Sequence, residues 1–435
     1  MNALRTVLDE GPWTGFRKRI GLFAILAVIL DGFDIQLVGV AIPALMHDWA
    51  VPRSAFVPVI ALSLIAMSTG TAIAGLLGDR LGRRSTLIGS MLLFGVATFG
   101  TIFAHSVTMF LVWRVIASLG LGGAMPNAVA LLSEFTPRRR RSFVVTLGMI
   151  STPLGGVMAG MVAATLLQPF GWRSLFVIGG ILPVLLGTVL LFQLPESPDF
   201  LRSKPSRIDH LRKLADKLGA VLTPADLQVA SHATRKGYAA LFTREFRKDT
   251  AMLWLCFLGV LTAAFCMFNW VPTLLGRFGY DPAVGGTGLA AFNFGGILGA
   301  ICGAVFIDRY GSRSLTVPFA VLGVGAALAT GVILAAGLPA IAIIAGLAVT
   351  GVFVAGLQPM LFAIAAHLYP DHTRATGVGA ALAVGRLGAI ASSAIGAVLI
   401  GIGSLAYFAF IAALMAVVLG ALIGLRRHVP SRSKA

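Results

Sequence analysis

Charged side chains are scarce in this sequence. Only 12% of the 435 residues are Asp, Glu, Lys or Arg, whereas 57% are hydrophobic and the mean hydropathy is +0.90. Soluble domains carry roughly 25% charged residues. The composition therefore excludes a soluble globular protein and predicts one that crosses a membrane many times.

Cysteine is also scarce. The chain has three, Cys256, Cys266 and Cys302, and all lie in apolar segments, where a buried thiol behaves as a small hydrophobic group. This pattern predicts neither a disulfide framework nor a metal site. We expect no metal and no cofactor.

Long apolar runs recur along the sequence. Each is about 20 residues long, enough to cross roughly 30 Å of hydrocarbon as a helix. The first run follows Arg17, Lys18 and Arg19 but is too long for a signal peptide. We predict an all-α fold with twelve transmembrane helices, at 20–45, 55–77, 86–104, 108–132, 143–166, 174–194, 251–275, 285–307, 315–337, 339–364, 376–401 and 404–425.

The net charge of +17 follows the predicted topology. With the N-terminus in the cytoplasm, 29 of the 34 Lys and Arg fall in the cytoplasmic loops and ends. This is the bias of inner-membrane proteins. We therefore expect both termini in the cytoplasm, the lipid bilayer as the partner of the basic loops, and no nucleic acid.

The two halves of the chain resemble each other. "GLLGDRLGRR" (75–84) recurs as "AVFIDRYGSR" (304–313), and "EFTPRRRRS" (134–142) is echoed by "HLYPDHTRA" (367–375). We predict a six-helix bundle at 1–195, a cytoplasmic loop at 196–250 and a second six-helix bundle at 251–435. Parallel repeats of this kind place a binding site between the bundles, near the middle of the membrane.

These motifs resemble those of a known family. The "GLLGDRLGRR" loop, its weaker second copy, "RVIASLGLGG" and "LPESPDFL" resemble the major facilitator superfamily over nearly the whole chain. Within it, "DGFD", "GLGLGGAMPNA", "NWVPTLL" and "YPDHTRATGVGAALAVGRLGAI" resemble the aromatic acid:proton symporters of the 4-hydroxybenzoate and protocatechuate type. The resemblance implies secondary transport rather than enzyme activity.

Two aspartates interrupt the first apolar run. Asp31 and Asp34 are three residues apart and so share one helix face. Burial and mutual repulsion favour protonation of at least one carboxyl, and a nearby arginine opposes it. We interpret them as the proton-coupling residues; the alternative is a structural pair neutralised by Arg114.

Two arginines fall within predicted spans, where a guanidinium costs at least about 2.5–3.5 kcal/mol. Arg386 lies near mid-depth, and its fork suits a planar carboxylate. We predict that it binds the substrate carboxylate; the alternative is a structural ion pair. Arg114 either serves the same carboxylate or pairs with Asp34, and the sequence leaves the two open.

Other polar and aromatic residues are weaker candidates. Asn127, Asn293 and Gln358 could line a cavity or only join helices, and the "GLQP" stretch around Gln358 is expected to break its helix. Trp270 could stack on an aromatic ring or belong to the core. Glu134, beside the Arg138–Arg141 run, is an ion-pair candidate.

The repeated loop combines an acidic residue, several arginines and glycines that permit close helix approach. By resemblance it is a conformational latch; the alternative is a basic loop that only sets topology. The expected latch residues are Gly75, Asp79, Arg80, Gly82, Arg83, Arg84, Asp308 and Arg309.

Together these features predict a monomeric transporter that imports a small aromatic carboxylate with protons by alternating access. The first alternative is proton symport of a non-aromatic organic acid or another metabolite. A drug:proton antiporter is disfavoured, because an arginine placed for an anion does not suit cationic drugs.

Overall fold

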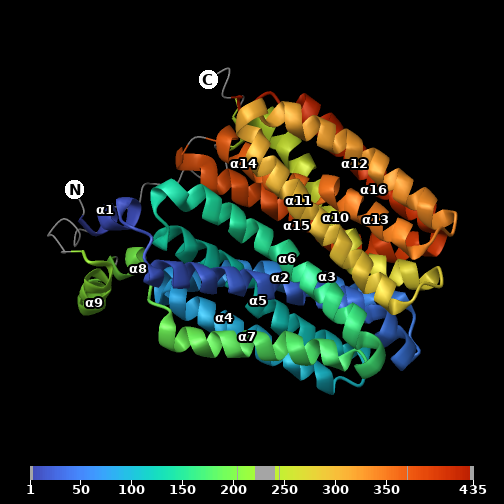
Figure 1. The fold of residues 1–435 in the computed structure, drawn as a ribbon, viewed down its shortest axis with the longest axis horizontal. Coiled ribbons are helices and arrows are strands. Elements are labelled where there is room, and N and C mark those ends of the chain that lie inside the picture. Colours follow the sequence, from blue (N-terminus) through green and yellow to red (C-terminus); the bar gives the residue numbers. More distant parts are fainter. Residues whose placement is uncertain (1–2, 203, 221–240, 244, 370, 432–435) are drawn as a thin grey trace. The chain divides into compact units, whose positions relative to one another are not determined.

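The regular structure of the chain is helical. The computed structural model describes residues 3–202, 204–220, 241–243, 245–369 and 371–431 (Figure 1). Within these ranges the helices are α1 Ala3–Glu10, α2 Gly15–Trp49, α3 Val57–Leu81, α4 Arg83–Gly100, α5 Val107–Phe135, α6 Arg138–Phe170, α7 Arg173–Gln193, α8 Pro198–Arg202, α9 Ile208–Leu218, α10 Arg247–Arg277, α11 Pro282–Tyr310, α12 Ser312–Ala335, α13 Ala340–Val354, α14 Leu357–Leu368, α15 Asp371–Ile402 and α16 Ser404–Gly424. Three short 3₁₀ helices join them: η1 Arg53–Phe56, η2 Thr101–Phe103 and η3 Pro205–Arg207.

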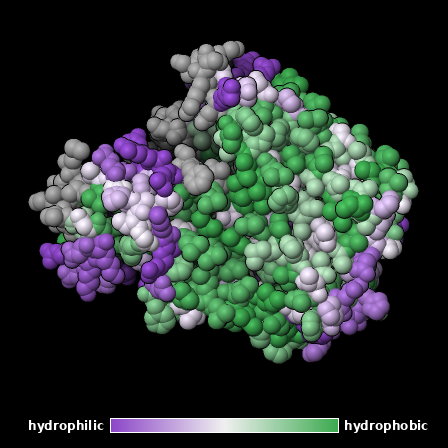
Figure 2. Space-filling view, in the orientation of Figure 1, coloured by the Kyte–Doolittle hydropathy of each residue, from purple (hydrophilic) through white to green (hydrophobic). Residues whose placement is uncertain are grey.

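The twelve predicted spans are confirmed. Twelve helical stretches in the described part of the chain are long and apolar enough to cross a membrane, and each predicted run corresponds to one of them. Their exposed side chains are largely hydrophobic: Leu76, Phe192 and Ile341 are 64%, 85% and 73% exposed. Figure 2 shows this apolar surface over the long helices, with polar residues gathered at helix ends.

The tenth span is broken, as "GLQP" predicted. α13 ends at Val354, Ala355 and Gly356 form a turn, and α14 begins at Leu357. Gly356 is required here, because a Cβ atom would lie 2.6 Å from the Cα of Gly299 on α11.

Contacts group the chain into two compact units. Unit 1 comprises residues 1–34, 65–155 and 176–232. In it α4 packs along α5, and the core extends to α1 and α9 through Leu4, Leu8, Leu211 and Leu214. α9 is therefore an amphipathic helix with its apolar face buried.

Unit 2 comprises residues 35–64, 156–175 and 233–435. Its main packing pairs are α10 with α15, α11 with α13 and α12 with α16. The C-terminal parts of α2 and α6 join them through glycines: a Cβ on Gly39 would lie 2.2 Å from the carbonyl oxygen of Phe268, and one on Gly160 would lie 2.4 Å from that of Gly286. The division at residues 195 and 250 stays a prediction.

The internal repeat is visible in the backbone. Gly82, between α3 and α4, has φ +108° and ψ 148°, and Gly311, between α11 and α12, has φ +81° and ψ 156°. Side-chain-bearing residues rarely adopt this region. The two copies of the loop therefore turn the same way, and each copy needs its glycine.

Candidate functional site

Asp34 and Arg114 form a buried ion pair. Asp34 lies on α2 and Arg114 on α5; their side chains are 0% and 2% exposed. Arg114 donates from Nη2 to Oδ2 at 2.8 Å and from Nη1 to Oδ1 at 3.2 Å, so the guanidinium grips both carboxylate oxygens. The ring of Phe176 on α7 lies 5.9 Å from the guanidinium carbon. Of the alternatives left open for Arg114, this structure contains the pair with Asp34.

Thr98 completes this cluster. Its hydroxyl, on α4, donates to Oδ1 of Asp34 at 2.7 Å, and Nη1 of Arg114 lies 3.4 Å from the same hydroxyl oxygen. Thr98 is fully buried. Three helices of unit 1 thus contribute one residue each to a closed, hydrogen-bonded charge cluster.

Asp31 lies one turn from Asp34 and is 3% exposed. Next to it, Gly32 packs against α6: a Cβ there would lie 2.1 Å from the carbonyl oxygen of Thr152. Gly155 on α6 packs back on α2 in the same way, 2.1 Å from the carbonyl oxygen of Ile29. α2 is helical through this position, and Gly32 serves the close approach of the two helices.

Arg386 and Gln358 lie on neighbouring helices of unit 2. Arg386 is half-buried on α15, and Gln358 is half-buried in the first turn of α14, directly after the helix break. α14 and α15 pack against each other. Their role in substrate binding stays a prediction.

Two further candidates, Asn127 and Trp270, are buried within their own units. Asn127 donates to the carbonyl of Gly123 on its own helix at 2.9 Å, and its Oδ1 lies against Gly78 of α3. The ring of Trp270 is fully buried, and a Cβ on Gly396 of α15 would lie 2.3 Å from its Cδ1 atom. In this structure both residues pack helices together.

Asn293 pairs with a residue that the sequence analysis did not single out. Gln36 donates to Oδ1 of Asn293 at 3.0 Å, and Asn293 donates to Oε1 of Gln36 at 2.7 Å. Both are fully buried. Gly156 makes room for them, since a Cβ there would lie 2.1 Å from Nε2 of Gln36. This amide pair joins α2 to α11.

The expected latch loop is tied to the end of α7. Arg83 lies 3.1 Å from Glu134, the single acidic residue of α5, and Ser197 also donates to Glu134. Oε1 of Glu196 accepts from the backbone N–H groups of Arg84 and Ser197, both at 2.9 Å. Glu134, expected to form an ion pair, is paired with Arg83 in this structure.

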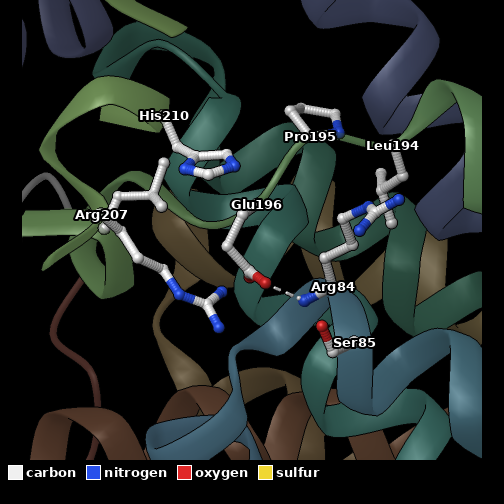
Figure 3. Close-up of a pocket in the computed structure, with 8 residues that line it drawn as sticks. Arg84, Ser85, Leu194, Pro195, Glu196, Arg207 and His210 are labelled. Carbon is white, nitrogen blue, oxygen red and sulfur yellow. Dashed lines mark hydrogen bonds between the residues drawn. The ribbon is translucent and has the colours of Figure 1, made fainter. Parts of the chain in front are cut away.

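Glu196 lies beside a surface pocket of about 310 Å³. Figure 3 shows its carboxylate turned towards the start of α4. The pocket is lined by Arg84, Ser85, Leu194, Pro195, Glu196, Leu201, Arg207 and His210.

The remaining residues of the expected latch are mostly exposed. Gly75, Asp79 and Arg80 face outward at the end of α3. In the second copy, Arg309 is exposed and its guanidinium lies 5.5 Å from the ring of Tyr310. The side chain of Asp308 lies outside the described residues.

Comparison with known proteins decides the family. The profile of the Major Facilitator Superfamily matches residues 24–329 and 274–435. The chain belongs to this superfamily. It is therefore a multi-pass transporter of the cell membrane, and not an enzyme.

Several relatives of the chain are named as transporters of aromatic acids. The chain is 35% identical over 409 residues to the 4-hydroxybenzoate transporter PcaK of Pseudomonas putida, covering 92% of this chain and 90% of that protein. It is 32% identical over 402 residues to the gallate transporter of Pseudomonas putida, covering 91% and 88%. The resemblance to aromatic acid transporters seen in the motifs is confirmed.

Solved structures of the superfamily share the fold. The inward-open form of the xylose transporter XylE from E. coli superposes with a TM-score of 0.74, covering 96% of this chain and 98% of XylE at 18% identity. The partially occluded form gives 0.73, covering 93% and 98% at 16% identity. The predicted major facilitator fold is confirmed.

The sequence analysis missed several buried polar residues of this transporter. Thr98 and Gln36 carry no charge and stand among apolar residues, so only three-dimensional contacts reveal them. Arg17 was interpreted as part of a topogenic basic run, yet it is 1% exposed. It donates to the carbonyls of Phe135, Val7, Pro12 and Leu8, and so satisfies the ends of α5 and α1.

Proposed function

We propose that this transporter imports a small aromatic carboxylate together with protons by alternating access. The observation that carries the proposal is the buried Asp34–Arg114 pair within two apolar spans. A titratable carboxyl at such a depth is costly and is typical of proton pathways. The names of the relatives support an aromatic acid as the cargo.

The coupling follows from the cost of an unpaired buried charge. Breaking a buried ion pair by neutralising one partner costs about 3–5 kcal/mol, because the other charge stays uncompensated. Asp34 therefore takes up a proton from outside only in a state in which its pair with Arg114 is open, and the arriving substrate anion favours that state. Asp31, one turn away, offers a second carboxyl, and Asp31, Asp34 or both take up the proton.

Arg386 is the proposed ligand of the substrate carboxylate. A guanidinium holds a planar carboxylate with two parallel hydrogen bonds. With the substrate anion and the proton both bound, the net charge of the binding residues is closer to zero. The change between the outward-open and inward-open states then costs less free energy. Release of both inside completes the cycle, and one polypeptide suffices for it.

The test is uptake by purified protein in proteoliposomes, with 4-hydroxybenzoate as the labelled probe. An inwardly directed proton gradient should drive accumulation above the outside concentration, and a protonophore should abolish it. Accumulation that persists with the protonophore would refute proton coupling.

Symport of a non-aromatic acid is the second candidate, since the same Arg and Asp chemistry would serve it. Competition decides between them. Unlabelled benzoate should inhibit probe uptake more strongly than an aliphatic carboxylate of similar size, and the reverse order would favour the alternative.

A further inference from the structure

Thr98 is placed to control the Asp34–Arg114 pair. An arginine side chain has donors and no acceptor, so the hydroxyl oxygen of Thr98 accepts from Nη1 of Arg114 at 3.4 Å. Its single hydrogen is therefore directed at Oδ1 of Asp34, 2.7 Å away. The hydroxyl thus bridges the two charged groups.

The described helices around this carboxylate in unit 1 carry few other charges. On its own helix, Asp31 is one turn away, and Arg114 faces it from α5. α4 carries charge only at Arg83 and Arg84 in its first turn, and α6 only in its first four residues. α7 contributes Phe176 here, whereas Arg173 at its start pairs with Asp48 at 3.6 Å. Among the described residues of unit 1, Arg114 and the Thr98 hydroxyl are bonded to the Asp34 carboxylate, and Asp31 lies one turn away.

We propose that Thr98 is a positioning residue for proton coupling, which sets how readily Asp34 leaves Arg114 and takes up a proton. The inference rests on the proposed function and names a part of its machinery. A donated hydrogen bond favours the ionised carboxylate. When Asp34 becomes neutral, that donation weakens and the hydroxyl must turn. The Thr98 hydroxyl therefore helps to hold Asp34 in its pair with Arg114, and the pair must open before Asp34 can exchange a proton.

The experiment compares Thr98→Val with Thr98→Ser. Valine keeps the shape and removes the hydroxyl, whereas serine keeps the hydroxyl. Thr101→Val is the matched control, because Thr101 is also fully buried near this end of α4, but its hydroxyl bonds only to the carbonyl of Ala97 among the described contacts. Initial uptake of the probe acid is measured in proteoliposomes against external pH.

We expect Thr98→Val to shift the pH of half-maximal uptake upward by about one unit. Its maximal rate should fall about tenfold, since proton release inside becomes harder. Exchange of labelled for unlabelled probe with the acid saturating on both sides needs no net proton release and should stay close to wild type. Thr98→Ser and Thr101→Val should keep the wild-type pH profile.

An unshifted profile in Thr98→Val, with normal exchange, would overturn the inference. So would equal losses of uptake and exchange in that variant with no change in profile, which would indicate a purely structural role. If Thr98→Val does not reach the membrane, Thr98→Ala provides the same test without a branched side chain. Loss of protonophore sensitivity in the wild-type protein would instead refute the proposed function itself, so the two failures are distinguishable.

Discussion

Gln36 and Asn293 exchange two hydrogen bonds of opposite direction, at 3.0 and 2.7 Å, and so join α2 to α11 within unit 2. Asn293 also donates to the carbonyl of Leu289, one turn back on its own helix. Every donor of the Asn293 amide is thereby occupied. The pair acts as a polar clasp between two apolar helices.

The first prediction concerns this clasp. Asn293→Ala should destabilise the purified protein by about 1–3 kcal/mol, because Gln36 then stays buried with its amide unsatisfied. Gln36→Ala should cost a similar amount, and the double variant should cost less than the sum of the two. Thermal unfolding in detergent measures all three. Strictly additive losses would show that the two amides do not depend on each other.

The second prediction concerns the two aspartates of α2, Asp31 and Asp34. Asp31→Asn and Asp34→Asn should each abolish uphill uptake of the probe acid while the protein still inserts, because an amide cannot carry the proton. Asp209→Asn is the control, since Asp209 is largely exposed on α9. Downhill exchange that survives in only one variant would identify the other aspartate as the residue needed for substrate movement. Full accumulation in both would refute their coupling role.

The third prediction concerns Arg386. Arg386→Lys keeps the charge but loses the fork, so the apparent affinity for the probe acid should fall at least about tenfold. The maximal rate at saturation should change less. Arg277→Lys, at an exposed position at the end of α10, should leave both parameters unchanged. An unaltered KM in Arg386→Lys would favour the structural ion pair.

The fourth prediction compares two glycines of the expected latch loop. Gly82 has φ +108°, and a Cβ there would lie 2.2 Å from Oε2 of Glu196. Gly82→Ala should therefore lower stability by at least about 1–3 kcal/mol. Gly75 has no atom within 4 Å of its Cβ position, so Gly75→Ala should change stability by less than about 0.5 kcal/mol. Detergent melting curves decide, and equal effects would contradict the strained turn at Gly82.

Hydrophobicity and helix signals were read correctly from the sequence because they are local. The apolar length that crosses a bilayer, the break at "GLQP" and the repeated "DRxG" turn each depend on residues adjacent in the chain. They appear in the structure as twelve spans, the turn at Ala355–Gly356 and the matching glycines Gly82 and Gly311.

Partner choice among polar residues was only partly predictable. The sequence showed that Asp34 and Arg114 each needed compensation, because isolated charges in hydrocarbon are costly. It left open whether they compensate each other. Thr98, Gln36 and the buried Arg17 gave no signal, since a hydroxyl, an amide or a basic residue before a span is also common where no specific contact exists.

The sequence by itself determined the membrane class, the twelve spans, the internal repeat and the superfamily, because these follow from composition and from short-range patterns. Only the tertiary structure decided that Arg114 grips Asp34 with Thr98 as a bridge, and that Asn293 pairs with Gln36. The physical reason is that a helix presents each buried polar group to several neighbours. Which of them becomes its partner depends on packing between segments far apart in the chain.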